Sequence, residues 1–306
     1  MEILGISRDK RFSPNSVARD DAIFACVAEG LRACGHRVTT WPEHQLPGKR
    51  VADLASFSAV FSMARDEGAL HLLAEAEQAL HLPTVNSARA ILRNSRAHLV
   101  TLLGGAGIPQ PPTRVVDTFT LQPLEGHLHD DVRFPLWVKR GDACAQSVTD
   151  VAYTPDRQAM IEAIEGFRRK DIHQAVVVEH AEGDLLKFYG VEGSSFFHSL
   201  YPTEGAGFSK FGLEAHNGRA RHYPYDSARL KSCADHAARV SGFTVYGGDA
   251  IIRPDGRFQI IDVNDWPSFS PCRQEAARAI VQRLLALSRK PQAPSPNDTF
   301  GINPQS

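Results

Sequence analysis

The sequence predicts a mixed α/β (α+β) fold, and three observations support it. Residues 1 to 86 alternate between short apolar runs and stretches of helical apolar spacing, which is the pattern of a small three-layer βαβ unit. Two β-rich apolar runs flank a Pro-Asp-Gly sequence at residues 254–256, which indicates an antiparallel hairpin. The chain has 306 residues, 42% of them hydrophobic and 23% charged, enough for a large core shared by about two domains.

Composition excludes several functional classes. A net charge of -1 gives no general attraction to nucleic acid or to a membrane surface. No apolar stretch approaches membrane-spanning length, and the first residues lack the basic flank of a signal peptide. The five cysteines form no CxxC pair, which is typical of reduced thiols. We therefore expect a cytoplasmic protein with no nucleic-acid partner and no membrane partner.

Apolar periodicity and turn residues predict the elements in order. In the first unit the strands are residues 3–7, 36–41, 57–63 and 83–86, and the helices are residues 20–34 and 67–80. Beyond it the strands are residues 134–139, 175–178 and 185–191, and the helices are residues 87–105, 226–241 and 270–289. A further helix lies within residues 153–169, with Pro155 near its start. The glycines and prolines after residue 104 indicate a domain boundary.

Basic residues follow the first and third predicted strands. No glycine fingerprint follows the first strand, so a classical dinucleotide site is not expected. The basic side chains either face an anionic substrate at the carboxyl ends of the strands or form solvated surface. They are Arg8, Lys10, Arg11, Arg19 and Arg65.

The hairpin predicts a cation site. If residues 255–256 form a two-residue loop, Asp249 lies opposite Asp262 with Cβ atoms about 5 Å apart, and the like charges require a cation between them. Asn264 points to the same face, whereas Val263 points to the core. Two carboxylates and an amide oxygen suit a divalent cation such as Mg²⁺. Alternatively the acids are polar residues on a solvated face, and a three-residue loop would turn Asp262 away.

Several motifs in this order resemble the ATP-grasp superfamily over residues 84 to 288. Lys139 ends a strand, an apolar strand leads into an acidic linker at 179–184, Lys187 lies within the next strand, and the Asp-containing hairpin follows. By itself, Lys187 either reaches solvent or meets an anion. The resemblance implies a pre-ATP-grasp α/β domain followed by a two-lobed ATP-grasp domain. The implied segments are residues 1–85, the first lobe with its connecting helix at 86–180, and the C-terminal lobe with the metal site at 181–289. The Pro/Ser/Asn-rich composition of residues 290–306 predicts a flexible tail.

The resemblance also implies ATP and Mg²⁺ as cofactors and assigns site residues. The implied phosphate contacts are Lys139 and Arg96, the adenine contacts are the backbone of Glu179, His180 and Ala181, and the ribose contact is Glu182. Lys187 is the implied contact to the γ-phosphate or to the acceptor, and the implied magnesium ligands are Asp249, Asp262 and Asn264.

A ligase is the activity that the resemblance implies first: a small carboxylate becomes an acyl phosphate, and an amine attacks it to form an amide or peptide bond. Arg273 is then the candidate to steady the carboxylate, because an arginine in the first turn of a helix opposes the helix dipole; otherwise it is a surface arginine. We expect small-molecule carboxylate and amine substrates, with a homodimer as the candidate assembly.

Two departures from the resemblance leave other functions open. The loop after Lys139 has Gly141 as its one glycine, where many relatives have several. Asp262 stands where many ligases of the superfamily have glutamate, and an aspartate there is similar to the inositol-trisphosphate kinases. The alternatives are therefore a small-molecule kinase and a nucleotide-binding module without catalysis.

Overall fold

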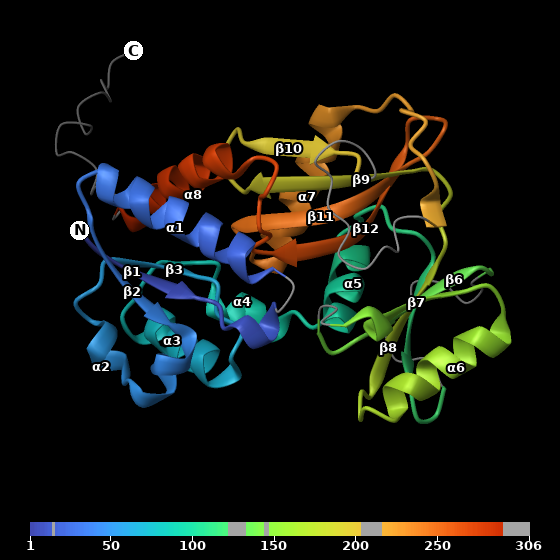
Figure 1. The fold of residues 1–306 in the computed structure, drawn as a ribbon, viewed down its shortest axis with the longest axis horizontal. Helices are drawn as coiled ribbons and strands as arrows, with labels where there is room; N and C mark the ends of the chain where they lie inside the picture. The colour runs from blue at the N-terminus through green and yellow to red at the C-terminus, as the bar shows by residue number, and fades with distance from the viewer. Residues whose placement is uncertain (14–15, 122–132, 144–146, 203–215, 290–306) are drawn as a thin grey trace, which may run out of the picture.

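A computed structural model describes residues 1–13, 16–121, 133–143, 147–202 and 216–289. The tail predicted at residues 290–306 lies outside the described part. The mixed α/β fold is confirmed: three four-stranded sheets carry helices on their faces, and Figure 1 shows how the sheets lie around a common centre. Among the described helices, none is long and apolar enough to cross a membrane.

The N-terminal sheet is parallel, with strand order β2-β1-β3-β4. Its strands are β1 (Glu2–Ser7), β2 (Arg37–Pro42), β3 (Ala59–Ser62) and β4 (Thr84–Val85). Its helices are α1 (Val17–Ala33), α2 (Val51–Leu54) and α3 (Glu67–Ala79), with 3-10 turns at Lys10–Phe12 and Glu43–Gly48. Ile3 of β1 packs in one core cluster with α1, and Leu4 packs in another with α3, so the helices cover opposite faces.

The central sheet is antiparallel, with strand order β5-β8-β6-β7. Its strands are β5 (Thr113–Asp117), β6 (Leu136–Arg140), β7 (Val151–Thr154) and β8 (Gln174–Glu179), and a 3-10 turn at Val148–Asp150 precedes β7. The helix α6 (Arg157–Arg168) packs on it through Ile164 and Phe167. The prediction of a helix within residues 153–169 that begins near Pro155 is confirmed, and Asp156 caps this helix.

The C-terminal sheet is antiparallel, with strand order β10-β9-β11-β12. Its strands are β9 (Asp184–Val191), β10 (Phe197–Leu200), β11 (Val245–Ile252) and β12 (Phe258–Asp265). The helix α7 (Ser227–Ser241) packs its apolar face against this sheet. The last described helix, α8 (Arg273–Ser288), returns to the N-terminal sheet and lies beside α1 (Figure 1). The two ends of the described chain therefore share one core.

The long helix predicted at residues 87–105 is two helices, α4 (Ala88–Arg93) and α5 (Arg96–Gly105). Between them, the Ser95 side chain accepts a hydrogen bond from the backbone N–H of His98 at 3.2 Å. Asn94 donates to the carbonyl of Ser241 at 2.6 Å. Asn and Ser favour caps over helix interiors because their side chains bond the nearby backbone. The break makes Arg96 the first residue of a new helix.

The predicted pairing of Asp249 with Asp262 is confirmed, but the predicted two-residue loop was wrong. The N–H of Arg253 donates to the carbonyl of Arg257 at 2.8 Å, so the loop has three residues, and the last of them, Gly256, has a left-handed φ of 79°. Such a loop alone would turn Asp262 to the opposite face.

A β-bulge restores the register. Ala250 pairs with Ile260, whereas Asp249 pairs with Asp262, so Ile261 is the extra residue. The carbonyl of Ile261 accepts a hydrogen bond from Nζ of Lys139 at 3.1 Å. The bulge therefore keeps the two aspartates opposite each other and also provides the contact between the hairpin and the central sheet.

Candidate active site between the three sheets

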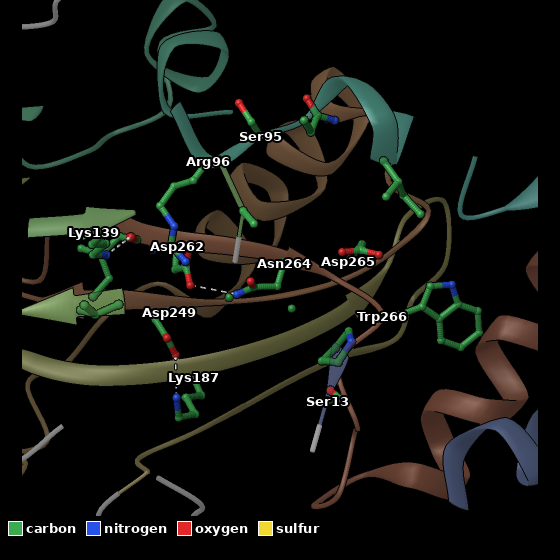
Figure 2. A pocket seen from close by; sticks show the side chains of 18 of the residues that line it. Ser13, Ser95, Arg96, Lys139, Lys187, Asp249, Asp262, Asn264, Asp265 and Trp266 are labelled. Carbon is green, nitrogen blue, oxygen red and sulfur yellow. Dashed lines mark hydrogen bonds and ion pairs between the residues drawn. The ribbon is translucent and has the colours of Figure 1, made fainter. Parts of the chain in front are cut away.

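A cavity of about 630 Å³ lies where the three sheets meet. We call it the interlobe cavity. It is lined by Lys139 of β6, by Lys187, Asp249 and Asp262 of the C-terminal sheet, and by Arg8 after β1. Figure 2 shows Lys139 of the central sheet and Lys187, Asp249 and Asp262 of the C-terminal sheet converging on one space.

Sheet register brings the charged residues of the C-terminal sheet into one row. Lys187 of β9 pairs with Asp249 of β11, which pairs with Asp262 of β12. Residues directly opposite on neighbouring strands have adjacent side chains. Nζ of Lys187 lies 3.1 Å from Oδ1 of Asp249, so the row places a cation beside two carboxylates. Asn264 points into the same space, and its Nδ2 donates to Oδ2 of Asp262 at 3.0 Å (Figure 2).

Asp262 is held in its charged form. Burial raises its pKa, but Arg96, Lys139 and the hydrogen bond from Asn264 outweigh burial and lower the pKa below the ordinary value. The closest guanidinium nitrogen of Arg96 lies 3.9 Å from Oδ1 of Asp262. A carboxylate that stays ionised while partly buried is a suitable cation ligand.

Lys139 is a nearly buried ammonium group, with 9% of the residue exposed. Burial lowers its pKa, and Asp262 and Asp249 only partly oppose that effect. Its hydrogen bond goes to the neutral carbonyl of Ile261, and no ion pair joins it to a carboxylate among the described residues. An anion in the cavity would therefore stabilise the charged form of Lys139.

Arg96 faces the same space from the N-terminus of α5. Its side chain is 8% exposed, and its Nε is buried without a hydrogen-bond partner in the described part of the chain. The next N–H group, of Ala97, donates to the carbonyl of Gly141 at 2.8 Å, which fixes the helix start against the loop after β6. A buried guanidinium at a helix N-terminus suits a phosphate group.

The segment after β8 forms another wall of the cavity. Glu179, His180 and Ala181 line it, as does Trp137 of β6. Nε1 of Trp137 donates to Nδ1 of His180 at 3.0 Å. Burial lowers the pKa of His180, which agrees with a neutral ring that accepts this bond. The aromatic rings of Trp137 and His180 in this wall suit the binding of a nucleobase.

Two predicted site residues do not line the cavity. Glu182 is exposed in the turn between β8 and β9. Arg273 is half-buried at the first position of α8, and its Nε has no hydrogen-bond partner among the residues described. The structure thus gathers the predicted phosphate, adenine and metal residues but leaves the ribose and carboxylate candidates outside.

The N-terminal basic residues divide into two groups. Arg8 and Arg65 line the cavity, whereas Lys10, Arg11 and Arg19 do not. The two lining arginines are paired with acids that sequence reasoning missed. Nη1 of Arg8 lies 3.0 Å from Oδ2 of Asp20, and Arg65 forms an ion pair with Asp265.

A sequence signal existed for one of these acids. Asp20 shares the buried face of α1 with Ile23, Val27 and Leu31, so it is an acid at an apolar position of a helical pattern. A buried acid needs a partner or a ligand. For Asp265, the sequence offers only its position next to Asn264.

Known proteins resemble this chain in structure rather than in sequence. No protein-family model matches it, and no curated protein matches its sequence. The RimK-domain ATP-grasp protein of Sphaerobacter thermophilus superposes with a TM-score of 0.62 at 19% identity, covering 92% of this chain and 99% of that one. The VanG D-Ala:D-Ser ligase of Enterococcus faecalis gives 0.64 at 14%, covering 94% and 99%.

A third structure contains nucleotide. The D-alanine–D-alanine ligase of Bacillus anthracis complexed with ATP superposes with a TM-score of 0.62 at 11% identity, covering 94% of this chain and 97% of that one. All three likenesses extend over nearly the whole length of both chains. Together with the three sheets and the cavity between them, they show that this chain has the ATP-grasp fold.

Proposed function

We propose that the protein is a Mg²⁺- and ATP-dependent ligase that joins a small carboxylate to an amine through an acyl phosphate. The observation that carries the proposal is the row formed by Lys187, Asp249 and Asp262, which lies beneath Lys139 and Arg96 in one cavity. This row combines ligands for a hard cation with groups that bind phosphate.

The residues fit the metal that the fold implies. Asp249, Asp262 and Asn264 offer carboxylate and amide oxygens on one face of the hairpin, the donor type that Mg²⁺ prefers. The described residues contain no group of three His, Cys, Asp or Glu side chains that could hold a metal. The two carboxylates of the hairpin suit an ion shared with nucleotide phosphates, since Mg²⁺ commonly binds through one or two carboxylates plus substrate.

The charge of the site suits Mg·ATP. Three cationic side chains, Arg96, Lys139 and Lys187, face two carboxylates. Bound Mg²⁺ would neutralise the negative charge that develops on the transferred phosphoryl group. In the proposal Lys139 and Arg96 hold the phosphates, and Lys187 leaves Asp249 to contact the γ-phosphate or the acceptor.

The remaining ATP contacts follow the aromatic wall. We assign adenine to the backbone of residues 179–181, and the ribose hydroxyls to Glu182, which lies one residue further along. Glu182 would have to turn inward when nucleotide binds. The ATP complex of the D-alanine–D-alanine ligase supports nucleotide binding by a protein of this fold.

The chemical step requires positioning and charge neutralisation. A carboxylate oxygen of the substrate attacks the γ-phosphorus, and ADP leaves. The amine nitrogen then attacks the acyl carbon, phosphate leaves, and the amine loses a proton to solvent or to phosphate. Neither step needs a covalent nucleophile from the protein. We assign Arg273 to the carboxylate, and since it does not line the cavity, that role requires α8 or its preceding loop to move.

Product analysis separates the ligase from the kinase and the binding module. The protein is incubated with ATP, Mg²⁺ and pools of amino acids, small carboxylates or inositol phosphates, and released phosphate is measured together with product masses. Free phosphate with a condensed product supports the ligase. ADP with a phosphorylated acceptor and no free phosphate would rule it out, and tight ATP binding without turnover would identify a binding module.

A further inference from the structure

The segment at residues 216–217 lies against the wall of the interlobe cavity that we assign to adenine. The ring of His216 stacks on Tyr153 with centroids 4.2 Å apart, and it meets the ring of Trp137 edge-on at 5.3 Å. Such ring contacts favour one arrangement of the segments that carry them. Asn217 follows directly and lines the cavity. It is therefore held beside the linker after β8, although the two are far apart in the sequence.

One hydrogen bond sets the orientation of the Asn217 amide. Its Nδ2 donates to the carbonyl of Ala181 at 3.2 Å. A carbonyl only accepts, so the nitrogen of the amide, and not its oxygen, must face Ala181. No other hydrogen bond joins Asn217 to the described chain. Since Asn217 lines the cavity, its Oδ1 is an acceptor that a ligand can use.

The linker after β8 has few backbone donors left for a base. The N–H of Glu179 donates to the carbonyl of Pro112 at 2.8 Å, and the N–H of His180 donates to the carbonyl of Pro135 at 2.9 Å. The N–H of Ala181 makes no hydrogen bond to the described chain. An unpaired backbone N–H is costly when it is covered from water. A base that covers the linker must therefore accept a hydrogen bond from Ala181.

Ala181 and Asn217 together present a donor and an acceptor to the cavity. The bond between Nδ2 and the Ala181 carbonyl joins the two residues, so the Ala181 N–H and the Asn217 Oδ1 belong to one hydrogen-bonded unit. Adenine carries the complementary pair, because an acceptor ring nitrogen lies on either side of its amino group. Guanine has a carbonyl oxygen in place of that amino group. Proteins distinguish the two bases by this difference.

We infer that Asn217 selects adenine: its Oδ1 accepts a hydrogen bond from the amino group of the base, while the N–H of Ala181 donates to a ring nitrogen. The inference rests on the proposed function and deepens it, since a side chain from a distant segment then reads the base together with the linker backbone. A base without the amino group leaves Oδ1 unpaired, and a base with a carbonyl oxygen there places two acceptors together. An acceptor that lacks a donor away from water weakens binding.

The test compares nucleotides that differ only at the base. The full chain is titrated calorimetrically, with Mg²⁺ and without acceptor substrates, with ATP, purine riboside triphosphate and GTP. Purine riboside triphosphate has the ring of adenine without its amino group. The wild type should bind ATP at least about tenfold more tightly than either of the others, because an unpaired acceptor shielded from water costs roughly that much.

Two substitutions remove the Asn217 amide. Asn217→Leu keeps the approximate size of the side chain, and it should weaken ATP by about tenfold relative to purine riboside triphosphate, so that the preference for ATP is lost. Asn217→Ala removes the amide without adding a branched side chain and should lose the same preference. Arg219→Gln is the matched control, because Arg219 is exposed in the same segment and does not line the cavity. It should keep the wild-type ratio of affinities.

Three results would overturn the inference. The first is equal binding of the three nucleotides by the wild type. The second is an unchanged preference for ATP in both Asn217 variants, which would assign the amino group to a carbonyl of the linker. The third is an equal loss of affinity for all three nucleotides, because Asn217 would then only hold the linker in place. A wild type that binds none of the nucleotides with Mg²⁺ would instead contradict the proposed function, so the two failures are distinguishable.

Discussion

Replacing Asp262 with asparagine removes one charge from the centre of the candidate site and changes little else. The amide keeps the size of the side chain and can still bond Asn264. Asp262 lies 3.9 Å from Arg96, and two unit charges at that distance interact by about 4 kcal/mol at an effective dielectric constant of about 20. A Mg²⁺ ion bound to the carboxylate would interact at least as strongly.

This interaction sets the size of the expected effect. Each 1.4 kcal/mol is about a factor of ten, so the full value corresponds to about three orders of magnitude. The Asp262 side chain is 24% exposed, and solvent screening reduces the effect. We expect Asp262→Asn to lower Mg²⁺-dependent turnover roughly 100- to 1,000-fold.

The affinity for ATP without Mg²⁺ should not fall as turnover does. Without Asp262, three cations face Asp249 alone, so ATP binding in the absence of Mg²⁺ should stay the same or become tighter. The assay is ADP release with Mg²⁺, together with calorimetric titration of ATP with and without Mg²⁺. Asp255→Asn at the exposed hairpin tip, where Asp255 pairs with Arg257, is the control and should match wild type. Unchanged Mg²⁺-dependent turnover in Asp262→Asn would refute the reasoning.

Three further substitutions test other parts of the account. Burial lowers the pKa of Lys139. Between that lowered pKa and the ordinary value the unfolded chain binds more protons than the folded chain, so the free energy of unfolding rises with pH. Urea unfolding should show that the stability of the wild type relative to Lys139→Met increases from pH 7 to pH 10, and thermal shifts should show that ATP no longer stabilises the variant. Gly248→Ala would put a Cβ 2.3 Å from the Asp262 carbonyl oxygen and should lower the free energy of unfolding by about 2 kcal/mol or more; an unchanged urea midpoint would contradict this. Arg273→Ala should raise the KM for the carboxylate substrate without changing ATP affinity, and identical steady-state kinetics would remove Arg273 from the mechanism.

The hairpin shows how far the sequence alone could predict this site. Counting outward from an assumed two-residue loop placed Asp249 opposite Asp262, and the structure has this pairing. The loop length was wrong, and the bulge at Ile261 compensated for it. A bulge of this kind depends on contacts from elsewhere, here the hydrogen bond from Lys139, and no local pattern reports such a contact.

The helix break at residues 94–95 could have been read from the sequence. Asn94 and Ser95 are both cap-forming residues, and His98 and Ser241 provide the bonds that they make. Apolar periodicity continued across them and favoured a single helix. Cap chemistry therefore carried more information here than the periodic pattern did.

The pairing of Asp20 and Asp265 with arginines could be found only in the structure. Asp20 lies about 245 residues before Asp265 in the sequence, and only the return of α8 to α1 brings their segments together. Pairing of Arg8 with Asp20 and of Arg65 with Asp265 is a tertiary property. Many strands and helices could be predicted because their patterns are local, whereas these two ion pairs could not because they are assembled from distant segments.

Binding of a non-hydrolysable ATP analogue with and without Mg²⁺ tests the central claim most directly. Calorimetric titration of the wild type should show at least tenfold tighter binding with Mg²⁺, and the double variant Asp249→Asn, Asp262→Asn should lose this difference while retaining affinity for the metal-free analogue. Equal affinity with and without Mg²⁺ in the wild type, or a Mg²⁺ effect that survives in the double variant, would contradict the assignment of the two aspartates to a magnesium site.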